Sequence, residues 1–573
     1  MEYLAIAQRK QAQLWERIPQ QWRLSPSQIP SGMHSPADSV TNVQYGRVNV
    51  LDIPRSCGLL SPKQIHITEN YDINDLLDQV HRQRLTAREV IEAFCKRAAI
   101  AHQLTRCLTE PLFEFALQRA QELDDHLRRT GAPIGPLHGL PVSVKDSFNI
   151  RGVDSSVGIA ALAFKTSETD APLVSLLQSL GAIIITKTNV PQTMGALDSA
   201  NHLFGRTLNP QNPQLTVGGS TGGEGALLAL RGSMIGFGTD IGGSIRIPAM
   251  CNGLYGFKPS NGRIPYGGQT DGQPKAKGRI SIQATAGPIA RSVADIDAVM
   301  RHLIPRAQWF GEDCIPGAWP SPISSFGKNN RPITIGVLPS DGLVEPLPPI
   351  SKVLYEVANA LRRTPGVAVI DLPVPKALSK CQALAGRLMG VDGGITMLDL
   401  LESTGEPLIP WLQTRTKRGR PLLLSQLAEL QAQRSALKLE LRKKLWTLDD
   451  SDNEQKIDAI IHPIAPHPVP ELDRYNAVGY TSSFVLLDYP AGVVPVRKFG
   501  RGDLESGKEI EMGVVGSWDK ANRELWNEKT VDRTVYLDSS LSVQVVTPKQ
   551  HDYELFQAME LIDRAIKTDR SKL

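Results

Sequence analysis

Three short segments hold the residues of this chain that could perform covalent chemistry. Lys145 ends Pro-Val-Ser-Val-Lys at 141–145, Ser220 lies within Gly-Gly-Ser-Thr-Gly-Gly at 218–223, and Ser244 ends Gly-Thr-Asp-Ile-Gly-Gly-Ser at 238–244. A serine hydroxyl is a weak nucleophile at neutral pH and needs a base within hydrogen-bond reach. A lysine can be that base when burial keeps it neutral. The residue types and their order therefore predict a Ser-Ser-Lys relay.

The residues just before Ser244 predict a site for a developing negative charge. Glycines let the backbone turn sharply and leave N–H groups free to point at one spot. The N–H groups of Ile241, Gly242, Gly243 and Ser244 could thus form an oxyanion hole for a tetrahedral intermediate. We therefore expect Ser244 to be the nucleophile.

In these segments and their spacing, the chain resembles the amidase signature family. Further similar segments are Leu-Asp-Tyr-Pro-Ala-Gly-Val-Val-Pro-Val at 487–496 and Ser-Val-Gln-Val-Val at 542–546. The resemblance is greatest to the eukaryotic branch, which holds fungal-type acetamidases and fatty acid amide hydrolases. It implies an α/β fold in which helices flank both faces of a large, twisted, mixed and mostly parallel β-sheet.

The resemblance also implies an activity and a role for each site residue. The activity is hydrolysis of a linear amide C–N bond to an acid and ammonia or an amine, through an acyl-enzyme on Ser244 and without a cofactor or metal. Ser220, preceded by a cis peptide bond, would pass a proton from Ser244 to neutral Lys145. Met194 would lie close to the substrate carbonyl.

Asp240 and Arg246 flank the glycine-rich turn, and we expect them to fix it through charge-assisted hydrogen bonds. Three positions depart from the common family pattern. Thr221 stands where a second serine is usual, and we expect it to keep that residue's hydrogen bond. Val217 replaces a frequent proline, and Gln192 replaces a frequent glutamate.

Other interpretations of the glycine-rich segments are weaker. Residues 218–225 lack the Gly-Lys-Ser/Thr ending of a phosphate-binding loop, and Ile241 stands where a dinucleotide fingerprint needs its third glycine. Gly218 to Gly222 fit the letters of a Gly-x-Ser-x-Gly nucleophile elbow, but a Pro-rich loop, not a strand, precedes them.

Histidines and cysteines offer no second chemistry. His462 and His467 are five positions apart in a Pro-rich segment, which matches no familiar metal-ligand spacing. The six cysteines form no Cys-x-x-Cys pair, and we expect reduced thiols. Cys251 follows Ser244 closely but has no base partner in the sequence.

Composition limits the partners. The chain has 573 residues and a formal charge of +4, from 63 basic and 59 acidic residues, with no long basic run. We therefore expect no nucleic-acid partner. The apolar stretches are too short to cross a bilayer, so we expect a soluble protein. A small-molecule amide is the expected partner, and a homodimer stays open.

Predicted strands and helices alternate along the chain, which favours a mixed, largely parallel sheet. We expect strands at 141–144 and 182–186, a helix after Thr86, and a long helix at 422–445. Lys145 would then lie at a strand end, where open α/β sheets collect ligand-binding groups. Residues 1–24 should form a largely amphipathic helix, with Leu4, Ile6, Leu14 and Trp15 near one face.

We predict one domain at 63–568, with its catalytic core at about 75–300, and an N-terminal helix and arm at 1–62. The segment at about 375–450 varies in the family and helps to wall the acyl pocket. Met389 and Met397 in it could line a channel or pack in the core. A catalytically impaired scaffold and an amidotransferase-like subunit remain alternative functions.

The C-terminal tail, 569–573, ends in Ser571-Lys572-Leu573. A free C-terminal Ser-Lys-Leu is an address read by the peroxisomal import receptor. We therefore expect this protein in the peroxisomal matrix, or otherwise in the cytoplasm.

Overall fold

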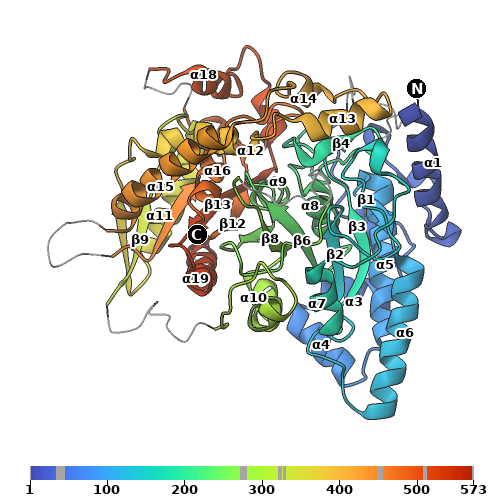
Figure 1. Cartoon of the computed structure of the whole chain (residues 1–573). Coiled ribbons are helices and arrows are strands. Elements are labelled where there is room, and N and C mark those ends of the chain that lie inside the picture. The colour runs from blue at the N-terminus through green and yellow to red at the C-terminus, as the bar shows by residue number, and fades with distance from the viewer. Residues whose placement is uncertain are drawn as a thin grey trace.

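The computed structural model describes residues 2–33, 40, 45–270, 281–320, 326, 331–447, 456–507 and 513–570. Eleven strands form one sheet in the order β1-β3-β2-β6-β8-β7-β12-β13-β11-β9-β10 (Figure 1). They are β1 (Leu108–Pro111), β2 (Pro141–Lys145), β3 (Ile183–Thr188), β6 (Ile235–Asp240), β7 (Tyr255–Lys258), β8 (Thr285–Ala290), β9 (Ile333–Val337), β10 (Val367–Asp371), β11 (Ala459–Pro463), β12 (Ala491–Lys498) and β13 (Ser540–Val546). The short strands β4 (Ala200–Asn201) and β5 (Gly205–Arg206) pair separately.

The helices of the described residues are α1 (Glu2–Glu16), α2 (Ile53–Ser56), α3 (Pro62–Glu69), α4 (Ile73–His81), α5 (Ala87–Thr105), α6 (Phe113–Thr130), α7 (Pro172–Ser179), α8 (Gly222–Ala229), α9 (Arg246–Asn252), α10 (Val293–Leu303), α11 (Pro348–Arg362), α12 (Cys381–Met389), α13 (Ile395–Ser403), α14 (Pro410–Gln413), α15 (Leu424–Trp446), α16 (Gly479–Leu486), α17 (Arg501–Leu504), α18 (Ser517–Glu524) and α19 (Asp552–Arg570). None of them is both long and apolar enough to cross a bilayer.

The mixed α/β sheet confirms the expected fold class, but the expected excess of parallel pairs is wrong. Only four of the ten neighbouring pairs run parallel: β3 with β2, β2 with β6, β11 with β9, and β9 with β10. Through the centre of the sheet, from β6 to β11, every neighbouring pair is antiparallel. Parallel neighbours need crossover connections such as α7 between β2 and β3, so the parallel order is confined to the two flanks.

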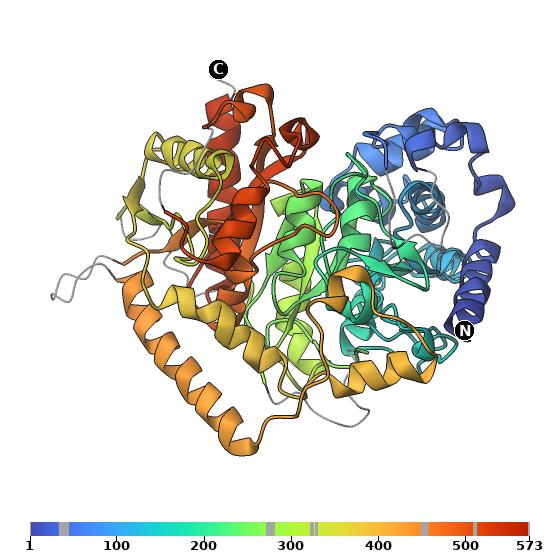
Figure 2. The same ribbon diagram turned by 90° about the horizontal axis from the view of Figure 1, so that it is seen from above.

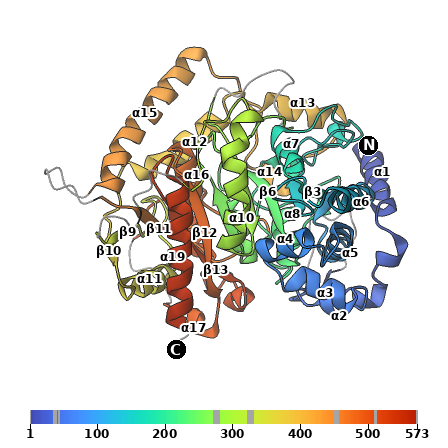
Figure 3. The same ribbon diagram turned by 90° about the horizontal axis from the view of Figure 1, so that it is seen from below.

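Helices cover both faces of the sheet. Gly256 of β7 faces Ala249 of α9, whereas Gly492 of β12 faces Met559 of α19. Gly492 pairs with Phe257, the residue after Gly256, so these two glycines point to opposite faces. Figure 3 shows α10 and α19 side by side over one face, and α8 and α9 pack on the other.

Local sequence signals place several elements where they were expected. Thr86 accepts a hydrogen bond from the backbone N–H of Glu89, and Glu89 caps Thr86 in return, which starts α5. The predicted helix at 1–24 instead ends at Glu16 because Ile18-Pro19 follows and proline has no N–H to continue it.

The predicted face of α1 is confirmed at Leu14 but not at Leu4 or Trp15, because the buried residues of the helix are Tyr3, Ala7, Lys10 and Leu14. Leu4 and Trp15 are exposed. The helix instead buries the Lys10 ammonium, which lies 2.5 Å from Glu110 and 2.7 Å from Asp154. Buried ion pairs of Lys10 with Glu110 and Asp154 thus attach α1 to the rest of the protein.

Candidate active site

Lys145 ends β2 and points into the interior. Its Nζ donates hydrogen bonds to Ser220 Oγ at 2.7 Å and to Thr239 Oγ1 at 2.8 Å. Burial lowers the pKa of Lys145 to about 7, although the charge of Asp240 opposes this shift. Near neutral pH a substantial fraction of Lys145 is therefore uncharged and able to accept a proton.

Ser220 lies in the loop before α8, and the Gly219–Ser220 peptide bond is cis, as the resemblance implies. Only a glycine fits before Ser220, because a Cβ at Gly219 would lie 2.5 Å from the carbonyl oxygen of Ala196. The backbone of residues 196–198 thus packs directly against Gly219, next to the serine that contacts Lys145.

Ser244 lies in the turn between β6 and α9, and Asp240 organises that turn. The Asp240 carboxylate accepts the N–H groups of Gly243 at 2.8 Å and Ile245 at 3.2 Å. Arg246 donates to both Asp240 oxygens at 3.0 Å, and to Gln544 and the carbonyl of Thr481. Burial opposes ionisation of Asp240, but Arg246 holds its pKa below the usual value.

This arrangement narrows the set of oxyanion donors. The Gly243 N–H is occupied by Asp240. No hydrogen bond among the described residues uses the N–H groups of Ile241, Gly242 or Ser244. Those three donors remain available to a substrate oxygen.

Thr221 differs from its expected role. Its Oγ1 is buried and has no hydrogen-bond partner within the described part of the chain. The side chain instead packs against Gly238, where a Cβ would lie 2.5 Å from the Thr221 methyl carbon. The extra methyl group, compared with serine, thus takes part in packing beside the turn.

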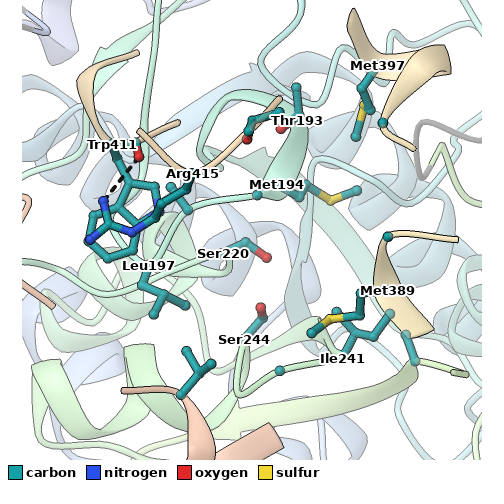
Figure 4. A pocket seen from close by; sticks show the side chains of 18 of the residues that line it. Thr193, Met194, Leu197, Ser220, Ile241, Ser244, Met389, Met397, Trp411 and Arg415 are labelled. Carbon is teal, nitrogen blue, oxygen red and sulfur yellow. Dashed lines mark hydrogen bonds between the residues drawn. The ribbon is translucent and has the colours of Figure 1, made fainter. Parts of the chain in front are cut away.

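Lys145, Ser220 and Ser244 all line one cavity of about 450 Å³. Figure 4 shows the two serines in it. The hydroxyls of Ser220 and Ser244 point toward one another across it. Its walls are mainly apolar and include Met194, Leu197, Ile241, Met389, Met397, Leu398, Leu401, Leu408 and Trp411. Met389 and Met397 therefore line the cavity.

The distant segment 389–416 supplies much of that wall. In Figure 2, α12 and α13 lie one after the other along the lower side of the molecule, with α15 further out. The segment is attached through Gln192, which donates to Glu406 at 2.7 Å and accepts the N–H of Ile409 at 3.0 Å. Burial raises the pKa of Glu406 to about 7.

Sequence reasoning missed several of these residues. Thr239 lies inside a quoted motif, so its hydroxyl could have been paired with Lys145. Glu406, Trp411 and Arg415 come from the variable segment and carry no local signal. Thr481, which donates to the carbonyl of Gly242, is equally remote in sequence.

The remaining candidates have structural partners. His462 Nδ1 lies 2.8 Å from the carbonyl of Leu338, and both ring nitrogens of His467 lie near backbone carbonyls. Burial raises the pKa of Cys251 well above its usual value, which disfavours a thiolate nucleophile. No cluster of three or more potential metal ligands occurs in the described ranges.

Comparisons with known proteins match this chain to amidases over most of its length. The amidase family profile matches residues 89–556. Acetamidases from Aspergillus oryzae and Emericella nidulans are each 34% identical, over 86% and 94% of this chain and 87% and 94% of their own lengths. A solved fatty acid amide hydrolase superposes with a TM-score of 0.85 at 27% identity, covering 99% of this chain and 95% of the other. The chain therefore belongs to the amidase signature family and is an acetamidase-like amidase.

Proposed function

We propose that this amidase acts through Ser244 as nucleophile, with Ser220 and Lys145 relaying the proton. The observation that carries the proposal is the 2.7 Å contact between Lys145 Nζ and Ser220 Oγ, made by a lysine whose burial lowers its pKa to about 7. Such a lysine is a competent base at neutral pH.

In the first step, Ser244 Oγ attacks the amide carbonyl carbon. Its proton passes to Ser220 Oγ, and the Ser220 proton passes to neutral Lys145 Nζ. The N–H groups of Ile241, Gly242 and Ser244 stabilise the oxyanion that forms, and loss of one such donor typically slows a reaction by about 10² to 10³.

In the second step, the C–N bond breaks and the relay runs in reverse. Lys145 returns a proton through Ser220 to the leaving nitrogen, which departs as ammonia or an amine. An ester on Ser244 remains. Water, deprotonated by the same relay, then attacks the ester, and the acid departs as Ser244 regains its proton.

The cavity supports an acyl group larger than acetyl. A volume of about 450 Å³ with mostly apolar walls far exceeds what acetamide would fill. We therefore assign primary amides with extended, largely apolar acyl chains as the preferred substrate class. The relatives named acetamidase and fatty acid amide hydrolase bracket this range of acyl size.

Two measurements on the purified chain test the proposal. A fluorophosphonate probe should label Ser244, identified by mass spectrometry, and Ser244→Ala should abolish labelling. Short, aryl and long-chain primary amides should release ammonia. A folded wild-type protein that is neither labelled nor active would point instead to a binding or scaffold role.

We further propose peroxisomal localisation, read from Ser571-Lys572-Leu573, which lie outside the described residues. The address requires a free C-terminus. An N-terminally tagged chain should enter peroxisomes, and deletion of Leu573 should leave it in the cytosol with unchanged activity in vitro. Cytosolic localisation of the intact chain would make the tripeptide a coincidence.

A further inference from the structure

One cation stands out on the wall of the cavity. Among the lining residues, the charged side chains are Lys145, Asp392 and Arg415. Lys145 belongs to the relay, and Asp392 accepts the backbone N–H of Gly394 at 3.0 Å. Arg415 lies outside the relay, and its local contacts leave part of its guanidinium without a partner among the described residues.

Stacking fixes the position of Arg415. Its guanidinium carbon lies 3.7 Å from the ring centroid of Trp411, which is itself buried (Figure 4). One terminal nitrogen, Nη1, donates to the carbonyl of Trp411 at 3.2 Å and to Thr414 Oγ1 at 3.3 Å. The planar group is thereby oriented before any ligand arrives.

The charge of Arg415 is not paired within the described residues. No carboxylate forms an ion pair with it, and its Nε and Nη2 atoms have no hydrogen-bond partner there. Asp473 influences Arg415 electrostatically, but its carboxylate is already held by Arg206 at 2.8 Å. Two donors of a positioned cation therefore remain free.

A nearby arginine shows the contrast. Arg418 pairs with Asp399 at 2.7 Å and with Glu402 at 2.8 Å, and it does not line the cavity. Arg418 is thus neutralised by two local carboxylates, whereas the partly exposed Arg415 has no ion pair among the described residues and lies beside the apolar cavity.

We propose that Arg415 binds a carboxylate at the far end of the substrate's acyl chain. The inference rests on the proposed function: a primary amide loses only ammonia, so the rest of the cavity must receive the acyl group. Apolar walls suit the methylene chain, and a guanidinium with free donors suits a terminal carboxylate. The preferred substrates are then monoamides of dicarboxylic acids, which yield the dicarboxylic acid and ammonia.

The experiment compares straight-chain amides of equal length with and without a terminal carboxylate, for example octanamide against the monoamide of suberic acid. In the wild-type enzyme kcat/KM should favour the carboxylate at a matched length. Arg415→Gln should lower kcat/KM for the carboxylate substrates about tenfold, mainly through KM, because the pair is partly solvated. Neutral amides should be little affected.

Three controls define the outcome. Arg418→Gln should change neither substrate class, and Arg415→Lys should retain part of the preference because it keeps the charge but loses the planar stack. Added salt should reduce the wild-type preference and leave Arg415→Gln unaffected.

Equal losses on neutral and carboxylate amides in Arg415→Gln would mean that Arg415 only packs on Trp411, and would overturn the inference. Wild-type turnover without a carboxylate preference would also overturn it and leave the proposed function standing. Failure to hydrolyse any amide would remove the proposed function and this inference with it.

Discussion

Lys145 Nζ lies 2.7 Å from Ser220 Oγ and 2.8 Å from Thr239 Oγ1, so the lysine of the proposed relay is shared between two hydroxyls. Ser220 opens onto the cavity that Ser244 also lines, and Thr239 comes from the strand that leads to Ser244. Thr239 can therefore orient the Nζ lone pair toward Ser220, a role that no isolated motif would reveal.

Loss of any member of the relay should nearly abolish turnover. Ser244→Ala should remove activity and covalent labelling. Ser220→Ala and Lys145→Met should each lower kcat by several orders of magnitude, because each interrupts the same proton path. The double variant should be little worse than either single one, since residues that act as a unit are not additive. Fully additive losses, measured by single-turnover ammonia release, would contradict a shared path.

The pH dependence should follow Lys145. Because the neutral amine is the active form and its pKa is about 7, kcat/KM should rise from acid pH and level off above neutrality. At about pH 5 the rate should be about a hundredfold below the plateau. Burial also raises the pKa of Glu406 to about 7, so Glu406→Gln serves as the control and should keep the same midpoint. A profile that peaks near about pH 5 would rule out a lysine base.

A methyl group should be tolerated differently at the two glycines before Ser244. Gly243 has φ of +127°, and a Cβ there would lie 2.5 Å from Thr481 Oγ1. Gly243→Ala should therefore destabilise the fold by about 1–3 kcal/mol. A Cβ at Gly242 meets no atom within 4 Å, so Gly242→Ala should unfold like the wild type. Urea unfolding of both variants makes the comparison, and equal stabilities would refute it.

The contact between Gln192 and Glu406 should control the pocket wall. Gln192→Glu places a second carboxylate against the buried carboxylate of Glu406 and removes the hydrogen-bond donor to it. The variant should therefore lower the free energy of unfolding by about 1–3 kcal/mol and raise KM for long-chain amides. The double variant Gln192→Glu with Glu406→Gln exchanges donor and acceptor, and it should recover most of both losses. No recovery in unfolding and KM measurements would mean that this contact does not hold the wall.

The sequence alone predicted the family and the elements that carry the three proposed catalytic residues. The positions of Lys145, Ser220 and Ser244, and the helix start at Thr86, were predictable because each depends on local requirements: a strand end, a turn that excludes side chains, or a capping box. The α/β class followed from the alternation of such elements.

Only the tertiary structure decided which partner each group takes. It assigned the Gly243 N–H to Asp240, left Thr221 Oγ1 without a partner among the described residues, and joined Glu406 to Gln192. It also brought Arg415 to a cavity that Lys145, far away in the sequence, lines as well. It also made the centre of the sheet antiparallel. Local preference fixes how a segment bends, but long-range packing decides which buried polar groups meet, because each must find a partner among segments that the chain brings together only on folding.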